Sequence, residues 1–488
     1  MLLFAAAIQA QLQGIALQSS IENVQPMTGI TFWTTSGYNT ENFVQLEYAY
    51  MDFNDVVEGQ GQYDWSGADG ILDGVEGRGH SAIFRFRYVN PGSQTTVPDY
   101  IKDLPDYQEQ QAQGDGRSTW YPDWSHEELQ RFTLEFYSNM AERYDGDPRL
   151  AFVQVGFGLW GEYHAWDYDG DNFLGGAFPS LEYQEQFFFH LDSVFERLHF
   201  SVSIDSYSSS RSPIVENEEI LNMAFGLFDD SFMQGAHEQN NATWWDALDH
   251  ETRFLRAPHG GEFSYYAGEQ PEVLNPDGGP NGKTFEESAE EHGISYMLGN
   301  AQPQYWPASR MVEAGLACGY KFRITAFRSG PGESLVEVTN EGVAPFYYDA
   351  HVAVNGTRAA ESLKNLAPGE SIICAVAAGG ADPILTIESD WIVDGQTIEY
   401  AADLDGSETV AALPYPPAAF LADKKEVDVF LYSVQGDLVL SQRLSAREAE
   451  GFLDKHSLRK TGLSRGIYVP YIQASGKRFR LMPVAVVY

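Results

Sequence analysis

Eight short, largely apolar segments recur over the first three hundred residues, and longer segments with a partly helical pattern separate them. Several of the short segments show little polar alternation, which is typical of strands buried on both faces of a parallel sheet. A doubly wound open sheet is the alternative, but no G-x-G-x-x-G or P-loop motif follows the first strand. Eight strands with intervening helices therefore predict a (β/α)8 TIM barrel. The expected strands span residues 29–35, 43–53, 80–89, 150–158, 200–206, 223–229, 252–257 and 293–299.

The pattern changes after the expected barrel, which takes up residues 22–320. Residues 321–405 carry short alternating strands separated by Asn-Gly and Pro-Gly turns, which predict a small antiparallel β-sandwich. Residues 406–424 include three prolines and are expected to form a linker. Residues 425–488 are expected to form a further β-sandwich. The predicted class is therefore α/β, with two all-β domains after the barrel.

The first 21 residues have features of a leader sequence. A short apolar stretch runs from Leu2 to Ile8, and small residues follow it before Gln11. This order resembles the apolar region and the cleavage end of a secretory signal peptide, although the positively charged region that normally precedes them is missing. We expect residues 1–21 to be a truncated signal peptide or leader. A buried N-terminal segment of the folded protein is the alternative.

The charge of the chain excludes several classes of partner. The sequence has 70 Asp and Glu against 30 Lys and Arg, which gives a formal net charge of −40. Nucleic-acid binding needs clustered basic residues, and so does attraction to anionic membrane surfaces, so neither is expected. No run of 18 apolar residues occurs, so no transmembrane segment is expected. Residues 424–488 reverse the balance, with 11 Lys and Arg against 6 Asp and Glu, and this change of sign indicates a domain boundary.

The C-terminal part has an ordered series of short motifs. An apolar run beginning at Val429 leads to a turn at Gly436, the sequence Gly-Ile-Tyr-Val follows at 466–469, and a basic strand comes last. This order and spacing resemble the C-terminal sorting domain of the type IX secretion system of Bacteroidota. The resemblance implies export by that machinery and a secreted or outer-membrane surface-attached protein. An ordinary accessory β-sandwich is the alternative.

Two glutamates follow expected strands of the barrel, at the end where barrel enzymes carry their active sites. Glu162 comes directly after the fourth expected strand and Glu262 shortly after the seventh, and each is preceded by glycine. Cleavage of a glycosidic bond needs one carboxylic acid to protonate the leaving oxygen and a second carboxylate to attack or to activate water. The two residues are therefore the predicted catalytic pair, and the alternative for each is a surface or loop-capping glutamate.

The sequence between residues 58 and 79 resembles a known clan. Glu58-Gly-Gln-Gly-Gln-Tyr-Asp-Trp65, followed by Gly79, is similar to the stretch after the second strand of many β-galactosidase-type barrels in the large retaining clan of glycoside hydrolases. The resemblance implies that Glu162 is the acid/base and Glu262 the nucleophile. One position departs from the clan pattern, because Gly161 stands where the clan usually has asparagine.

A second resemblance covers roughly residues 25–400. Two stretches, residues 158–164 and residues 336–345, resemble a family of secreted bacterial proteins with a barrel and a C-terminal sandwich, named domain of unknown function 4832. This resemblance implies carbohydrate processing and a carbohydrate substrate, without identifying the sugar.

Further residues are candidates for substrate binding. Arg85 and Arg87 share one face of the third expected strand, where they could clamp a carboxylate or orient the second glutamate, or fill the barrel as structural ion pairs. An aromatic group around Glu162 could form a wall for sugar stacking or belong to the core. That group and the other candidates at strand ends are Trp160, Tyr163, His164, Trp166, Asp205, His259, Tyr296, Asn300 and Trp306.

No metal site and no cofactor are expected, although one segment has a weak resemblance to a calcium-binding loop. Asp167, Asp169 and Asp171 alternate as in calcium loops, but Asn172 and Phe178 stand where such loops carry glycine and a bidentate glutamate. A polar substrate-contacting loop is the alternative. Two cysteines, Cys318 and Cys374, allow one disulfide or two buried thiols.

Two other functions remain open at this point. A carbohydrate-binding or surface protein could keep the barrel without hydrolysis, and the missing asparagine favours this alternative. A polysaccharide lyase acting on uronic acids would depend more on Arg85, Arg87 and His164. The predicted function is hydrolysis of a polysaccharide or oligosaccharide by a two-glutamate retaining mechanism.

Overall fold

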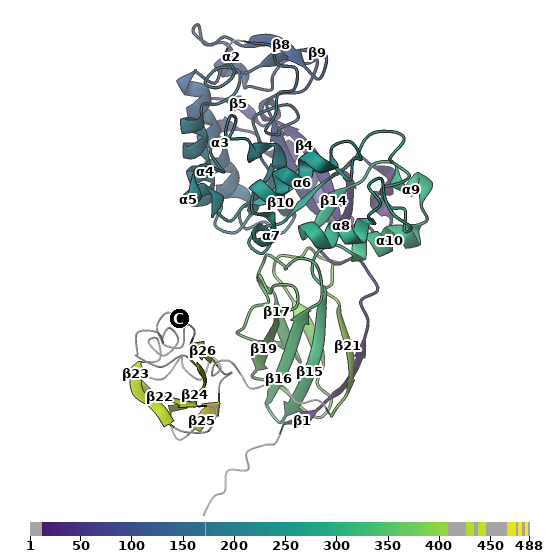
Figure 1. Cartoon of the computed structure of the whole chain (residues 1–488), viewed down its shortest axis with the longest axis vertical. Helices are drawn as coiled ribbons and strands as arrows, with labels where there is room; N and C mark the ends of the chain where they lie inside the picture. The colour runs from purple at the N-terminus through teal and green to yellow at the C-terminus, as the bar shows by residue number, and fades with distance from the viewer. Residues whose placement is uncertain are drawn as a thin grey trace, which may run out of the picture.

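The computed structural model describes residues 12–170, 172–407, 426–433, 438–445, 466–474, 477–480 and 484–486. A barrel, a β-sandwich and a separate C-terminal sheet follow one another along the chain (Figure 1). None of the helices among the described residues is long and apolar enough to span a membrane.

Eight parallel strands form a closed barrel, which confirms the predicted fold class. The barrel closes because the last strand pairs with the first, with Tyr296 opposite Gly29. The strands are β3 (Gly29–Trp33), β4 (Leu46–Asp52), β7 (Ser81–Arg87), β10 (Leu150–Gln154), β11 (His199–Ser203), β12 (Gly226–Phe232), β13 (Gly260–Phe263) and β14 (Tyr296–Leu298).

The seventh strand lies later in the chain than the sequence predicts. Residues 252–257 were expected to form it, but helix α7 (His250–Arg253) and a turn occupy that segment. The strand is β13, and Glu262 lies within it. A Cβ atom at Gly260 would come within 2.3 Å of the Tyr296 ring, so this strand needs glycine where an apolar side chain would normally mark it.

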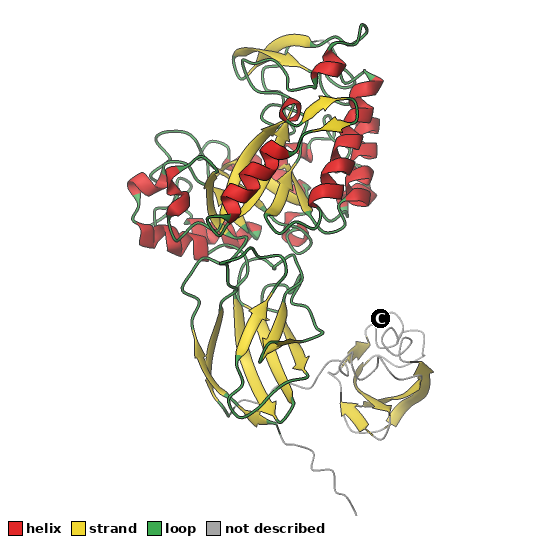
Figure 2. Ribbon diagram, turned by 180° about the vertical axis from the view of Figure 1, so that it is seen from behind, coloured by secondary structure: helices red, strands yellow, loops and turns green. Residues whose placement is uncertain are grey.

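Helices surround the barrel strands, as Figure 2 shows. Helix α3 is typical: Leu129, Phe132, Phe136 and Met140 lie on one face of it and are buried. The longer helices are α1 (Ser66–Glu76), α3 (Glu127–Tyr144), α4 (Leu181–Val194), α6 (Glu238–Ala247), α8 (Phe285–His292) and α10 (Ala308–Leu316). Shorter elements are η1 (Gly37–Thr40), η2 (Phe53–Asp55), η3 (Ile204–Tyr207), α2 (Asp99–Lys102), α5 (Glu218–Leu221), α9 (Gln302–Tyr305), β5 (Val57–Gly59), β6 (Gln62–Tyr63), β8 (Gln110–Gly114) and β9 (Arg117–Tyr121).

The sandwich consists of a six-stranded and a three-stranded sheet. The larger sheet contains β1 (Gln13–Gly14), β2 (Ala16–Ser19), β15 (Phe322–Gly330), β16 (Glu333–Asn340), β19 (Ser371–Val376) and β21 (Tyr400–Asp405). The smaller sheet contains β17 (His351–Val354), β18 (Thr357–Arg358) and β20 (Leu385–Glu388). Strand β2 pairs with β21, so this segment, expected to belong to a leader, is part of the sandwich. Residues 1–11 lie outside the described residues.

The sandwich covers the N-terminal end of the barrel. Tyr348 stacks with Phe152 at the start of β10 and donates a hydrogen bond to the Ala151 carbonyl. Tyr347 donates to the carbonyl of Phe254 at 2.6 Å. One apolar cluster therefore runs from the barrel into the sandwich. Because this end of the barrel is closed, the C-terminal ends of the strands are the ones left for a ligand.

The C-terminal strands form their own antiparallel sheet. It contains β22 (Glu426–Ser433), β23 (Leu438–Ser445), β24 (Gly466–Ala474), β25 (Lys477–Arg480) and β26 (Val484–Val486). The expected turn at Gly436 and residues 408–425, which include most of the expected linker, lie outside the described residues. The assignment of this part as a sorting domain stays a prediction.

Candidate active site

Arg85 is the centre of the candidate site. It lies on β7 inside the barrel and is fully buried. Its Nη1 donates to Oε1 of Glu162 at 2.9 Å, and its Nη2 donates to Oε1 of Glu262 at 2.8 Å. One guanidinium thus binds both predicted catalytic carboxyl groups, although a hundred residues separate them in the sequence.

A layer of neutral polar side chains holds Arg85 in place. Its Nε donates to Oε1 of Gln154 at 2.6 Å, and the hydroxyl of Tyr48 donates to the same oxygen at 2.6 Å. The Gln154 amide in turn donates to the hydroxyl of Tyr296 at 2.6 Å. The guanidinium also lies 4.3 Å from the ring centre of Phe228. Tyr296 therefore supports the site from the barrel interior, and Gln154 and Tyr48 are supporting residues that the sequence analysis missed.

The loop after β10 turns Glu162 into the barrel. Backbone amides of Phe157 and Gly158 both donate to the carbonyl of Glu162, at 3.1 and 2.7 Å. Trp160 and Gly161 adopt left-handed backbone angles, with φ of 54° and 79°. A Cβ atom at Gly161 would approach the Arg85 side chain at 3.3 Å. A side chain at this position would crowd Arg85, so the loop favours glycine over the asparagine that the clan resemblance implied.

Glu162 stands in an environment that favours its neutral, protonated form. It is 2% exposed, and its Oε2 lies 2.7 Å from Nε2 of His164. Burial raises the pKa of Glu162 to about 8; the charge of Arg85 opposes this shift, and the charges of Glu262 and Asp205 add to it. Burial also lowers the pKa of His164 to about 4, so this imidazole is neutral at pH 7. A carboxyl group that keeps its proton at neutral pH can act as a general acid.

Glu262 has a different environment. It is 4% exposed and is paired with Arg85. Tyr265 follows it in the chain, and burial followed by the charge of Glu262 raises the pKa of the Tyr265 phenol. Burial, with the Glu262 charge as the next largest cause, also raises the pKa of Tyr50. Both phenols therefore keep their protons beside the Glu262 carboxylate.

Strand β12 and the segment after β11 add three more carboxyl groups, those of Asp229, Asp230 and Asp205. Burial raises the pKa of Asp229 to about 7, and its carboxylate accepts hydrogen bonds from the Asn241 amide at 2.9 and 3.0 Å. Burial, followed by the charge of Glu162, raises the pKa of Asp230 well above its usual value. The Asp230 side chain is 29% exposed, against 3% for Glu162 and 5% for Glu262. Asp230 is therefore the most exposed of these three carboxyl groups.

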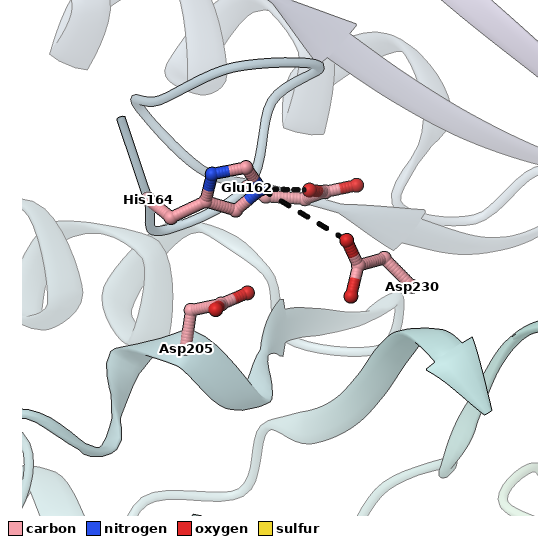
Figure 3. A group of neighbouring side chains, drawn as sticks. All are labelled: Glu162, His164, Asp205 and Asp230. Atoms are coloured by element: carbon pink, nitrogen blue, oxygen red, sulfur yellow. Dashed lines mark hydrogen bonds and ion pairs between the residues drawn. The ribbon is translucent and has the colours of Figure 1, made fainter. Parts of the chain in front are cut away.

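Four of these side chains could hold a metal ion. Glu162, His164, Asp205 and Asp230 point toward one another in Figure 3, and each offers a ligand atom within 4.8 Å of the others. Carboxylate oxygens with an imidazole nitrogen suit divalent ions such as Mn²⁺ or Zn²⁺. No metal ligands were predicted from the sequence, so this donor set is visible only in the structure. The expected calcium pattern does not contribute to it, and Asp171 lies outside the described residues.

Five of the other predicted binding residues lie at the site or at its rim. His164 and Asp205 lie with Glu162, and Trp166, 41% exposed, stacks on His164 with ring centres 4.9 Å apart. Trp160 is partly buried and reaches the site through its carbonyl, which accepts from Arg85 at 3.5 Å. Arg87 is at the rim, where it pairs with Asp52 at 2.9 Å.

Two other predicted residues belong to the core and do not form a substrate-binding wall. Tyr163 is fully buried and packs against Phe157 and Phe178, so it belongs to the core. His259 is also buried, at the N-terminal end of β13, and packs on Trp245.

Two predicted residues follow the last barrel strand, Asn300 shortly after β14 and Trp306 after helix α9. Asn300 is exposed there, and its backbone amide donates to Gln302 at 2.5 Å. The indole of Trp306 donates to the Pro271 carbonyl at 2.8 Å and packs on the core. No hydrogen bond or ion pair within the described ranges joins either side chain to Glu162 or Glu262.

Comparison with known proteins gives distant matches in structure alone. No model of a known protein family matches the chain, and no curated protein sequence matches it. Solved structures that resemble it include the catalytic domain of a β-amylase from Paenibacillus polymyxa, at 12% identity and a TM-score of 0.37, over 60% of this chain and 98% of that one. The GH36 α-galactosidase AgaA from Geobacillus stearothermophilus matches at 11% identity and a TM-score of 0.35, over 74% of this chain and 57% of that one. An intracellular xylanase from Thermoanaerobacterium saccharolyticum matches at 8% identity and a TM-score of 0.34, over 56% and 84%. The resemblances to domain of unknown function 4832 and to a sorting domain stay predictions.

Proposed function

We propose that the protein is a glycoside hydrolase in which Glu162 is the general acid/base and Glu262 the nucleophile. The observation that carries this proposal is the bridge through Arg85, which binds Glu162 at 2.9 Å and Glu262 at 2.8 Å from one guanidinium. Two carboxyl groups held together at the open end of a barrel are the groups that glycosidic cleavage requires.

The two carboxyl groups differ in the way that the reaction needs. Glu162 keeps its proton because burial raises its pKa, so it can protonate the leaving oxygen. Glu262 accepts a hydrogen bond from Arg85 at 2.8 Å, which holds its carboxyl group in position to attack the anomeric carbon. After the glycosyl-enzyme forms, Glu162 is a carboxylate and takes a proton from water. The water oxygen bonds to the anomeric carbon as the ester bond to Glu262 breaks, which frees the sugar and regenerates the Glu262 carboxylate.

The shared guanidinium supports a retaining mechanism. Both carboxyl groups lie against the terminal nitrogens of one side chain, so they stay close to each other. Retaining enzymes have carboxyl groups about 5 to 5.5 Å apart, whereas inverting enzymes place them roughly 6.5–9.5 Å apart to leave room for water. We propose the retaining outcome, a secreted or surface-attached enzyme, and a carbohydrate polymer or oligomer as substrate.

A screen of the purified protein against polysaccharides tests this proposal. We expect release of reducing ends from at least one polymer and no release by the Glu162→Gln/Glu262→Gln variant. Binding of a polymer by parent and variant alike, without release by the parent, would instead identify a carbohydrate-binding protein. A product that absorbs near the ultraviolet edge would identify a lyase, since elimination creates a double bond and hydrolysis does not.

The pH dependence of hydrolysis should report the proton on Glu162. With a pKa of about 8, Glu162 is protonated below that pH and ionised above it. We therefore expect kcat/KM to fall tenfold per pH unit above about pH 8, because the free enzyme loses its acid. Measuring kcat/KM from pH 5 to 10 checks this. In Glu162→Gln the limb near pH 8 should be absent, and a limb that persists would assign it to another group.

Zinc should inhibit the enzyme. The four donors include Glu162, and a divalent ion bound there requires its carboxylate form. We expect added Zn²⁺ to stop hydrolysis and a chelator to restore it, because the ion takes the place of the catalytic proton. Initial rates over a Zn²⁺ series measure the effect. The Asp205→Asn variant should need more Zn²⁺ for the same inhibition, and an increase in rate with Zn²⁺ would contradict the proposed role of Glu162.

A further inference from the structure

Arg211 has an unusual position next to the candidate site. It lies after η3, and its backbone is fixed: its amide donates to the Ser208 carbonyl at 2.9 Å, and its carbonyl accepts from the buried amide of Gln184 at 2.7 Å. The guanidinium carbon lies 4.7 Å from the ring centre of Trp166. Trp166 stacks on His164, which contacts Glu162. Two residues, Trp166 and His164, thus stand between Arg211 and the proposed acid.

The guanidinium of Arg211 has no hydrogen-bond or ion-pair partner among the described residues, and Trp166 is its one ring contact there. Its Nη1 is buried and makes no hydrogen bond, and no carboxylate lies within ion-pair distance of the side chain. A buried donor without a partner is costly, and such groups in native proteins call for a specific explanation. Two other arginines near the site are paired, Arg85 with both glutamates and Arg87 with Asp52.

The charge of the chain makes an unpaired arginine here more informative. The sequence has 70 acidic residues against 30 Lys and Arg, so acidic partners are abundant. Stacking on an indole holds the guanidinium plane and leaves its N–H groups directed to the side. This fork geometry matches an anionic group with two or more oxygens. Trp166 is 41% exposed, so a ligand can reach the indole and the arginine together.

We propose that Arg211 binds an anionic substituent, a carboxylate or a sulfate ester, on the sugar next to the bond that is cleaved. This inference rests on the proposed function for its place in the reaction, and it names the substrate class: an acidic glycan. The exposed indole of Trp166 contacts the apolar face of the same or the adjoining ring. Arg85 and Arg87 are already paired with carboxyl groups, whereas Arg211 is not, so the anionic group is bound at Arg211 and not at the glutamates.

Hydrolysis of matched polymers by variants tests the inference. The panel contains polygalacturonate and alginate for carboxylates, carrageenan for sulfate esters, and galactan and xylan as neutral polymers. We expect hydrolysis in one of the anionic arms. Arg211→Gln should lower kcat/KM on that polymer about 10- to 100-fold, mainly through KM, since a charge-assisted hydrogen bond is lost. The kcat/KM of Arg211→Lys should lie between those of the parent and Arg211→Gln, because lysine keeps the charge and loses the planar guanidinium.

Arg197→Gln is the matched control. Arg197 is exposed, has no described side-chain partner, and lies just before β11, at the opposite end of the barrel. This variant removes the same charge and should leave kcat/KM unchanged. Thermal unfolding of all variants shows whether the substituted proteins remain folded. If Arg211→Gln unfolds near the parent's temperature and yet hydrolyses the anionic polymer as well as Arg197→Gln does, the inference is wrong.

The outcomes separate this inference from the proposed function. Hydrolysis of neutral polymers alone, unaffected by Arg211→Gln, supports the hydrolase and overturns the acidic substrate. If no polymer is hydrolysed, titration of the parent with oligogalacturonate and with carrageenan oligosaccharides by calorimetry still tests Arg211. Binding that is lost in Arg211→Gln and kept in Arg197→Gln supports the anion site in a protein that is not a hydrolase. Equal binding by all three proteins, or none by the parent, overturns it.

Discussion

The Glu262→Gln variant should lose more than roughly 10⁴-fold in kcat on every glycoside that the parent hydrolyses. The amide cannot form the covalent bond to the anomeric carbon, so the first step of the retaining mechanism is lost. Glu162→Gln should lose about 10²- to 10⁴-fold on natural substrates, which is the usual contribution of a general acid. Steady-state rates on the polymer found in the screen measure both losses.

A change of leaving group tells the two roles apart. A 2,4-dinitrophenyl glycoside needs no protonation to depart, so Glu162→Gln should form the glycosyl-enzyme at nearly the parent rate and then hydrolyse it slowly. Glu262→Gln should remain inactive on the same substrate. Added azide should accelerate Glu162→Gln and give a glycosyl azide of retained configuration, because azide attacks the glycosyl-enzyme.

Glu272→Gln provides the control for both variants. Glu272 also comes after β13, but it is exposed, and within the described part of the chain its carboxylate accepts a hydrogen bond from Asn275 alone. The substitution makes the same chemical change outside the site and should leave kcat within about twofold of the parent. Reversed behaviour of the two glutamates, with Glu262→Gln active on the dinitrophenyl substrate, would exchange their roles. Full activity of both variants would remove the dyad.

The barrel was predictable because most of its strands are continuous apolar runs. The seventh strand was not, since Gly-Gly-Glu-Phe has a single large apolar residue, and the close approach of the Tyr296 ring requires the glycine. The segment before it, around Leu255, looked more like a strand but forms the end of α7 and a turn. The N-terminal strand β2 was missed for another reason: it pairs with residues 402–405, and local sequence carries no information on so distant a partner.

The site was partly predictable for a related reason. Glu162 and Glu262 were found because charged residues at strand ends are unusual in a buried barrel. Gln154 and Tyr48 were missed, because neutral polar residues within apolar strands give no signal until their hydrogen bonds to Arg85 are seen. His259 was predicted from its nearness to Glu262 in the sequence, but it lies at the other end of β13 and packs in the core.

Arg85 should be among the residues whose replacement most destabilises the protein. The Arg85→Met variant removes a fully buried cation and leaves Glu262 as a buried charge without its partner. Breaking a buried ion pair in this way costs on the order of 3–5 kcal/mol. Urea unfolding followed by intrinsic fluorescence measures the change in the free energy of unfolding. The variant should also be inactive, because Glu262 loses the side chain that holds it in position.

A double-mutant cycle separates the charge from the packing. In Arg85→Met/Glu262→Gln the unpaired charge is gone, so the double variant should be more stable than Arg85→Met alone. We expect a coupling energy of about 1–3 kcal/mol between the two positions.

Arg87→Met with Asp52→Asn is the matched control on the same strand. That pair also joins at 2.9 Å, but its side chains are 18% and 31% exposed, so each variant should change stability by less than about 1 kcal/mol. If Arg87→Met lowers the free energy of unfolding as much as Arg85→Met does, the instability comes from substitution in this strand and not from the buried charge. An additive cycle at Arg85 and Glu262 would mean that burial of the glutamate does not depend on the arginine, and the bridge could then not be what holds the two carboxyl groups in their catalytic arrangement.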